Sequence, residues 1–337
     1  MKALVTGASG FIGRRLASAL ARRGHDVACL VRKTSKTACL DGLPVELIVG
    51  DLGDPGSLDA AVAGRTWVFH LAGVVQAAGE SAFEAANVEG TRNLVAACLR
   101  QAPGPERFVF VSSIAAAGPS APDRPGTETD EPHPVTAYGR SKLEAEGVVM
   151  DHPRRLPATI VRPPNVLGPG SKELERAMAL VRKGIFPSIG DGRPRTSLID
   201  VDDLVEALIL AASNVRSIGQ TYYVTDGRAY AWPEITAALA EELGVGRARI
   251  RVRVPHGAQI LAAGIAEAVA RMTGKPPALT RAIVRAGHDH FWIYDSSKIE
   301  RELGFRPRST MRDSVRRSVM EAGPKAGSKR PLGGARS

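Results

Sequence analysis

The stretch Thr6-Gly7-Ala8-Ser9-Gly10-Phe11-Ile12-Gly13 joins a short apolar run to a helical pattern near the start of the chain. Gly7 permits a tight turn, Gly10 lets the backbone approach a pyrophosphate, and Gly13 lets the helix and strand pack closely. The N-terminus of the following helix then points toward the phosphates and favours their negative charge. Glycine-rich turns also occur without a ligand, so the flanking strand and helix patterns carry the prediction of a dinucleotide-binding turn.

Short apolar runs alternate with helical patterns through the first half of the chain, as in βαβ units on a parallel sheet. They are rich in Val, Ile and Leu, which is typical of strands covered on both faces. The predicted strands are Lys2–Thr6, Val27–Val31, Val45–Val49, Trp67–Leu71, Arg107–Val111 and Ala158–Val161. A helix is predicted from about Phe11 to Arg23, closed by Gly24. These patterns predict an α/β fold, a Rossmann-type doubly wound parallel sheet.

The pattern changes after residue 165, where the glycine- and proline-rich loops Pro163–Gly170 and Pro187–Pro194 alternate with predicted helices. Those helices are Lys172–Lys183, Asp202–Ala212 and one beginning near Trp232. A late strand at Gln220–Val224 is predicted to return to the sheet, and residues 255–320 are predicted to be mainly helical. We therefore predict a Rossmann domain over 1–165, a smaller, mostly helical substrate-binding region over 166–322, and a disordered basic tail over 323–337.

Composition excludes several classes of protein. The chain has 337 residues, of which 44% are hydrophobic, so it can bury a sizeable core. No apolar run is long enough to predict a membrane-spanning helix, and no signal-peptide pattern is present at the N-terminus. We therefore expect a cytoplasmic protein.

The chain has a net charge of +10 and three cysteines, and we expect neither a nucleic-acid partner nor a metal site. Aromatic residues make up only 5% of the chain and are not interleaved with a basic patch, so a phosphate-bearing ligand explains the charge more economically. Cys29, Cys39 and Cys98 are too few and too scattered for a disulfide framework or a zinc site.

The glycine-rich stretch resembles the Thr-Gly-x-x-Gly-x-x-Gly motif of the extended short-chain dehydrogenase/reductase superfamily, and other segments follow in the family's order. Gly50-Asp51-Leu52 resembles the segment that contacts the adenine ring, and His70-Leu71-Ala72-Gly73 resembles the loop after the fourth strand. Residues 87–94 resemble the helix that stabilises the sheet. The resemblance covers roughly residues 1 to 320 and implies a nicotinamide dinucleotide cofactor and a small-molecule substrate; a homodimer follows by analogy.

The resemblance also implies which residues contact the cofactor. They are Gly7, Ser9, Gly10, Phe11, Ile12, Gly13, Asp51, Leu52, Leu71, Ala72, Gly73, Asn87, Tyr138, Lys142, Pro163 and Val166. The choice of dinucleotide depends on the end of the second strand, where NAD enzymes usually carry a carboxylate for the ribose. Arg32 and Lys33 stand there instead and favour NADP(H), although a solvated basic loop would look the same and NAD(H) stays open.

Tyr138 and Lys142 are four residues apart and therefore share one face of a predicted helix. A tyrosine hydroxyl is a poor base at neutral pH, and we expect the lysine ammonium and the oxidised nicotinamide to lower its pKa. Ser113, at the end of the fifth strand, would hydrogen-bond the reacting oxygen. The resemblance favours Ser113 over Ser112, because the family's catalytic serine commonly lies five positions before a glycine. Here Ser113 lies five positions before Gly118.

The predicted trio suggests a mechanism. During oxidation the Tyr138 phenolate takes the alcohol proton while the substrate carbon delivers hydride to the nicotinamide. Reduction reverses these steps. A Tyr-x-x-x-Lys pair alone would be weak evidence, and the other motifs give it weight.

The substrate side is less specific. Asn165 lies where nucleotide-sugar epimerases and dehydratases often have an asparagine that contacts the sugar diphosphate, although it would also suit a turn. Those enzymes tend to carry an arginine at the position of Thr196, and here the arginine is Arg195, one place earlier. Three C-terminal segments resemble instead the dihydroflavonol-reductase and 3β-hydroxysteroid-dehydrogenase branch: Thr273–Pro277, Asp295–Lys298 and Glu302–Pro307.

Two further features have ordinary packing as their first interpretation. The apolar helix Ala258–Met272 is predicted to pack in the core, with an apolar substrate pocket, a membrane surface or a partner subunit as alternatives. His288, His290, Phe291 and Trp292 cluster nearby, and no pattern relates them to the trio.

The sequence thus predicts an NADP(H)-preferring dehydrogenase or reductase that acts on a secondary alcohol or ketone. One alternative is a nucleotide-sugar epimerase or dehydratase that uses bound NAD(P) transiently. Another is a nucleotide-sensing regulator without turnover, which the intact trio disfavours. The pattern leaves open the substrate, the direction of reaction and the oligomeric state.

Overall fold

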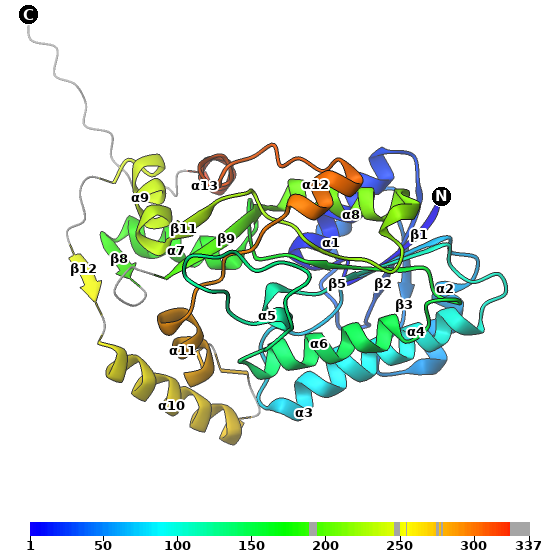
Figure 1. The fold of residues 1–337 in the computed structure, drawn as a ribbon, viewed down its shortest axis with the longest axis horizontal. Coiled ribbons are helices and arrows are strands. Elements are labelled where there is room, and N and C mark those ends of the chain that lie inside the picture. Colours follow the sequence, from blue (N-terminus) through cyan, green and yellow to red (C-terminus); the bar gives the residue numbers. More distant parts are fainter. Residues whose placement is uncertain (189–193, 246–249, 254, 274–275, 278, 324–337) are drawn as a thin grey trace, which may run out of the picture.

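The computed structural model describes the 337-residue chain except for residues 189–193, 246–249, 254, 274–275, 278 and 324–337, so nearly all of the predicted tail lies outside it. Its centre is a seven-stranded parallel sheet with the order β10-β6-β5-β4-β1-β2-β3 (Figure 1). The strands are β1 (Lys2–Thr6), β2 (Asp26–Val31), β3 (Glu46–Val49), β4 (Trp67–His70), β5 (Arg107–Val111), β6 (Ala158–Arg162) and β10 (Thr221–Tyr223). The predicted Rossmann-type sheet is confirmed, and the late strand β10 does return to it beside β6.

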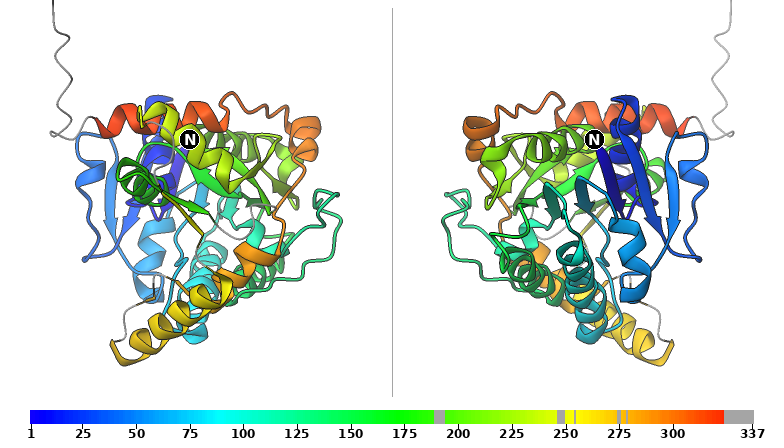
Figure 2. Two further views of the ribbon diagram at one scale, coloured as in Figure 1. Left: turned by 90° about the vertical axis from the view of Figure 1, so that its left-hand side faces the viewer. Right: turned by 90° about the vertical axis from the view of Figure 1, so that its right-hand side faces the viewer.

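Helices cover both faces of the sheet because successive side chains of a strand point to opposite faces. In β1, Ala3 and Val5 belong to one buried cluster and Leu4 to the other. The first face packs against α1 (Phe11–Arg22), α8 (Val201–Ser213) and α12 (Ser297–Leu303). The second packs against α2 (Leu58–Val62), α4 (Gly90–Arg100) and α6 (Ala137–Met150), as the layers in Figures 1 and 2 show.

Short helices join these layers at the carboxyl ends of the strands, where parallel sheets place their ligands. They are α3 (Glu80–Phe83), the π-helical turn Glu84–Glu89 that continues into α4, and α5 (Ile114–Ala117).

The C-terminal region builds a third core between α7 (Lys172–Arg182), α9 (Trp232–Glu242) and α13 (Met311–Ala322). A small sheet of order β11-β9-β7 supports it, with the strands β7 (Asn165–Leu167), β9 (Arg195–Asp200) and β11 (Ala229–Ala231). The pair β8 (Ile185–Ser188) and β12 (Ile250–Arg253) leads to α10 (His256–Thr273) and α11 (Arg281–Asp289). The sequence patterns missed these five strands because β7, β8, β11 and β12 have only three or four residues and β9 has no apolar–polar alternation.

Asp200 fixes the C-terminal helix α13 to the junction between β9 and α8. Its Oδ1 accepts a hydrogen bond from the backbone N–H of Asp202 at 2.9 Å and so caps α8. Its Oδ2 accepts from the Ser314 hydroxyl at 2.5 Å and pairs with Arg317, both on α13. The carboxylate is buried, with 2% of the residue exposed, so each partner compensates for its desolvation.

We predict that Asp200→Ala lowers the free energy of unfolding by about 3 kcal/mol, because it removes a helix cap and leaves Ser314 and Arg317 without their buried partner. Urea denaturation measures the loss. Asp202→Ala is the matched control: this side chain is 45% exposed, and although it also pairs with Arg317 it should cost less than about 1 kcal/mol. Equal losses in the two variants would contradict this account of α13.

Candidate active site

The glycine-rich turn has the geometry of a phosphate cradle. Gly7 has a φ of +71°, and a Cβ there would lie 2.8 Å from the backbone nitrogen of Ala72. A Cβ at Gly13 would lie 2.2 Å from the carbonyl oxygen of Gly7, so only glycine allows α1 to begin this close to β1. No side chain caps α1 at Gly10, and its first turn contains no acidic residue. The uncapped helix N-terminus therefore fits a diphosphate.

A buried histidine organises the neighbouring loop. The backbone N–H of Ala72 donates to the Thr6 hydroxyl at 3.1 Å, and that hydroxyl lies 2.8 Å from Nδ1 of His70. Nε2 of His70 lies 2.9 Å from the hydroxyl of Thr91, which donates to the carbonyl of Asn87 at 2.6 Å. Counting donors places the imidazole proton on Nε2. Burial, with a smaller contribution from the charge of Lys142, lowers the pKa of His70 to about 3, so the ring stays neutral and acts as a structural link.

Asn87 uses its whole side chain within the protein. Its amide nitrogen donates to the carbonyl of Val74 at 3.0 Å and to the Ser141 hydroxyl at 2.9 Å, and its oxygen accepts from the Val74 N–H at 2.8 Å. The side chain therefore links the loop after β4 to α6. Asn87 helps to hold that loop, which belongs to the predicted cofactor site.

The adenine side of the predicted cofactor site lies at the ends of β2 and β3. Arg32 and Lys33 are exposed directly after β2, and no Asp or Glu occurs between residues 27 and 40. The Asp51 carboxylate accepts the N–H of Gly53 at 2.9 Å and shapes its own turn, while Leu52 packs against Gly90 of α4.

The structure brings Ser113 and Tyr138 together, although they lie on different elements. Ser113 follows β5 and caps α5, and its oxygen accepts the N–H of Ala115 at 3.1 Å, which leaves its hydroxyl proton free to donate. Tyr138 lies in the first turn of α6. A Cβ at Gly139 would lie 2.2 Å from the carbonyl oxygen of Ala115, so this glycine is what lets α6 approach α5.

Burial raises the pKa of Tyr138 to about 12, and its hydrogen bond with Ser113 acts weakly in the opposite direction. The expected lowering by Lys142 is not seen, because the Lys142 ammonium donates to the carbonyl of Val111 at 2.8 Å and lies 4.1 Å from the centre of the Phe110 ring. Burial lowers the pKa of Lys142 itself to about 7, while the Glu146 carboxylate raises it.

A buried ion pair lies one helical turn beyond Lys142. The Glu146 carboxylate accepts two hydrogen bonds from Arg162, from Nε at 2.9 Å and from Nη2 at 2.5 Å, and a further one from the Ser112 hydroxyl. Nη1 of Arg162 donates to the Tyr223 hydroxyl at 2.9 Å. Both charged side chains are at most 7% exposed. Glu146 is four residues from Lys142, as Lys142 is from Tyr138, so the helical spacing could have identified it.

A cavity of about 760 Å³ opens beside the trio. Ser113 and Tyr138 line it together with the predicted substrate residues Asn165 and Arg195. Most of its other lining residues are apolar, including Phe83, Ile114, Pro164, Trp232, Ile283 and Trp292. Pro163 and Val166 hold the adjoining loop: the carbonyl of Pro163 accepts the N–H of Ile114 at 3.0 Å, and Val166 pairs with β9.

His290 and Trp292 line this cavity as well, and Trp292 also packs against a buried cluster that contains Tyr223 and Tyr294, as the interpretation of ordinary packing expected; the side chain of His288 lies outside the described residues. Trp292 reaches the cavity because the segment that follows α11 pairs with β9 at Thr196. No local pattern could have shown this, since the two segments are about a hundred residues apart.

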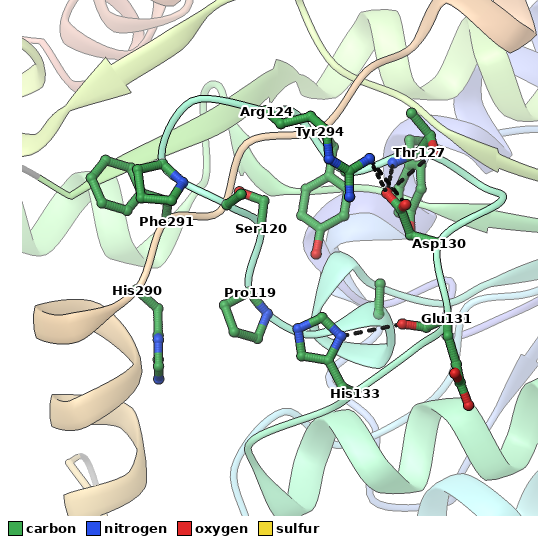
Figure 3. A pocket seen from close by; sticks show the side chains of 15 residues that line it. Pro119, Ser120, Arg124, Thr127, Asp130, Glu131, His133, His290, Phe291 and Tyr294 are labelled. Carbon is green, nitrogen blue, oxygen red and sulfur yellow. Dashed lines mark hydrogen bonds and ion pairs between the residues drawn. The ribbon is translucent and has the colours of Figure 1, made fainter.

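A second cavity, of about 470 Å³, has a lining of described residues that shares His290 with the first (Figure 3). Its arginine and one of its carboxylates are paired with each other. Arg124 donates to the Asp130 carboxylate at 3.0 Å, and Nδ1 of His133 lies 3.2 Å from the carbonyl oxygen of Glu131. None of the trio lines it, so we place the candidate site in the larger cavity.

Comparison with known proteins identifies the family that this chain resembles. Residues 3–225 match the model of the NAD dependent epimerase/dehydratase family. A 4-hydroxy-2-methyl-3-oxo-4-farnesyl-3,4-dihydroquinoline-1-oxide ketoreductase of Stigmatella aurantiaca is 31% identical over 96% of this chain and 97% of its own. A 2-alkyl-3-oxoalkanoate reductase of Stenotrophomonas maltophilia is 30% identical over 94% and 98%. The structure of MoeE5 in complex with UDP-glucose and NAD is 25% identical, covers 96% of this chain and 98% of its own, and superimposes with a TM-score of 0.77.

The depressed pKa of Lys142 gives a testable link between the site and stability. The folded chain releases the Lys142 proton near pH 7, whereas the unfolded chain releases it only near pH 10.5. The free energy of unfolding therefore rises with pH between those two values, and below pH 7 the folded chain bears the full cost of burying the charged ammonium. We predict that Lys142→Met is the more stable protein at pH 7, and that its advantage shrinks by on the order of 2–3 kcal/mol by about pH 9.5.

Urea denaturation at the two pH values measures this change. Lys172→Met, at an exposed position of α7, is the control, and its difference from the wild type should not vary with pH. A pH-independent difference for Lys142→Met would mean that the buried lysine carries no such cost.

Proposed function

The chain belongs to the NAD dependent epimerase/dehydratase family, and we propose that within it this protein is an NADP(H)-preferring reductase that converts a ketone to a secondary alcohol. The observation that carries the proposal is the pairing of Ser113 with a protonated Tyr138 at the wall of a mainly apolar cavity.

The residues of the chain fit a dinucleotide. The turn Gly7–Gly13 and the N-terminus of α1 would hold the diphosphate, and Arg32 and Lys33 would meet a ribose 2′-phosphate. The loop Leu71–Gly73, fixed by Thr6 and His70, would border the nicotinamide half. The reduced nicotinamide, when bound, supplies the hydride.

Tyr138 would act as the general acid of the reduction. With its pKa raised to about 12, its hydroxyl is protonated at neutral pH, which is the form that can give a proton to the carbonyl oxygen as that oxygen becomes negative. The Ser113 hydroxyl, whose proton is free to donate, would stabilise the same oxygen. Lys142 does not lower the pKa of Tyr138 while its ammonium is held at the carbonyl of Val111, so its role would be to return a proton to the phenolate that remains.

The cavity favours a ketone with an apolar body. Its apolar walls offer burial to alkyl or ring carbons, and the polar groups at Asn165 and Arg195 would orient one polar end. The names of the two reductases reported above describe ketones that carry farnesyl and alkyl groups, which supports the same class for this chain.

A nucleotide-sugar epimerase or dehydratase is the second candidate. Asn165 and Arg195 lie in the cavity where such a substrate would place its diphosphate, and MoeE5 binds UDP-glucose. This reading predicts retained NAD(P) with no net change in absorbance at 340 nm. A nucleotide-sensing regulator would bind the cofactor without turnover of either substrate class.

We predict that Tyr138→Phe lowers kcat for NADPH-dependent reduction of apolar ketones by about 1,000-fold, because the proton donor is lost while the ring stays in place. Absorbance at 340 nm follows the reaction, and titration of NADPH fluorescence should show cofactor affinity within about two-fold of the wild type. Tyr222→Phe, which removes a tyrosine hydroxyl that donates to Glu302 outside this cavity, is the matched control and should retain turnover. A Tyr138→Phe enzyme that keeps its activity would contradict the assignment of Tyr138 as the proton donor.

We predict that Arg32→Glu reverses the cofactor preference, because a carboxylate repels a 2′-phosphate and accepts hydrogen bonds from a 2′-hydroxyl. The ratio of kcat/KM for NADPH to that for NADH should fall by about 10-fold or more. Arg22→Glu, in the last turn of α1, is the matched charge reversal and should leave the ratio unchanged. An unaltered ratio in Arg32→Glu would identify the segment as a solvated loop.

A further inference from the structure

Helix α10 presents an apolar face to solvent. Leu261 is 67% exposed, Ile265 59%, Val269 51% and Met272 87%. The spacing of four, four and three residues puts them on one stripe of the helix, and the exposed Ala262 and Ala268 between them are also apolar. The predicted packing of this face in the core is therefore wrong.

The opposite side of α10 belongs to the candidate active site. Glu267 lines the larger cavity and binds Arg281 at the start of α11 with an Nε–Oε2 distance of 2.8 Å. Ile283 of α11 and Pro277 line the same cavity. Figures 1 and 2 show α10 at the outer edge of the molecule, far from α13. The helix thus separates the cavity from the apolar face.

The chain around this face is strongly basic. Residues 247–285 contain eight arginines and lysines and a single acidic residue, Glu267, so this segment contributes most of the net charge of +10. The basic positions lie in the sequence just before α10, at its end, and in α11, where Arg281 and Arg285 are exposed. Glu267 lines the cavity and is paired with Arg281, so it neutralises one of these charges and leaves the segment with an excess of positive charge.

This charge decides between the surfaces that could cover the apolar face. In a dimer formed through α10, two basic segments would lie together and repel each other. An anionic lipid surface attracts the arginines and lysines and receives the apolar side chains, which is how helices of this composition bind at an interface. Among the described residues no helix is long and apolar enough to cross a membrane.

We propose that the apolar face of α10 docks this protein on an anionic membrane surface. Leu261, Ile265, Val269 and Met272 enter the acyl boundary, and the basic charge of the segment 247–285 supplies the attraction to the headgroups. Docking in this orientation turns the α10–α11 side of the cavity toward the bilayer. An apolar ligand could then pass between the lipid and the cavity without crossing bulk water.

Co-sedimentation of the full chain with vesicles tests the proposal without any substrate. The wild type should bind vesicles that mix phosphatidylglycerol with phosphatidylcholine, and bind phosphatidylcholine alone at least about 10-fold more weakly. The double variant Leu261→Glu/Ile265→Glu should lose binding to the anionic vesicles by at least about 10-fold. Leu261→Ser/Ile265→Ser, which adds no charge, should lose nearly as much and covers the case in which the glutamates disturb folding.

Val215→Glu is the matched control, since Val215 is 65% exposed on an element remote from α10 in the sequence, and its binding should equal that of the wild type. Equal binding by the wild type and both α10 variants would overturn the proposal and assign any vesicle affinity to the basic C-terminal residues. Absence of binding by the wild type would overturn it too. So would light scattering that shows a wild-type oligomer which the variants convert to monomer, because a second copy would then cover the face. Vesicle binding needs no turnover, so a failed reductase assay would leave this result standing.

Discussion

The buried ion pair between Glu146 and Arg162 is the constraint on which the site depends. Its charges are almost fully removed from water, so removing either partner would leave an uncompensated charge in the interior. The pair joins α6 to the end of β6, and Tyr223 extends it to β10. Because Tyr138, Lys142 and Glu146 follow each other at four-residue intervals, fixing Glu146 sets the rotation of α6 and directs the other two side chains toward β5.

Two kinds of structure meet at this helix. The cofactor side is built from backbone: glycines that admit no Cβ, an uncapped helix N-terminus, and a loop held by Thr6, His70 and Asn87. The substrate side is built from side chains of the C-terminal region, which reach the cavity from α11 and the small sheet. A backbone cradle suits a ligand that many relatives share, whereas side chains on short elements can change with the substrate.

Burial has opposite consequences for the two titratable members of the trio. It keeps Tyr138 protonated and favours release of the proton from Lys142, because in both cases removal from water destabilises the charged form. The site therefore starts from a state with little charge, and charge appears when the substrate oxygen and the phenolate become negative. Preorganised donors such as Ser113 are most effective in these surroundings.

The sequence by itself predicted the parallel sheet, its strand segments, the glycine-rich turn and the segments that carry the proposed trio, because strand composition, turn chemistry and helical spacing are local properties. It did not show that His290 and Trp292 reach the cavity, and its first interpretation of the exposed face of α10 as part of the core was wrong. Those depend on which distant segments meet: the residues after α11 pair with β9, while nothing in the described structure covers Leu261 and Ile265. Only the tertiary structure decided these points, because an apolar helical stripe looks the same in sequence whether a core, a substrate or a lipid surface receives it.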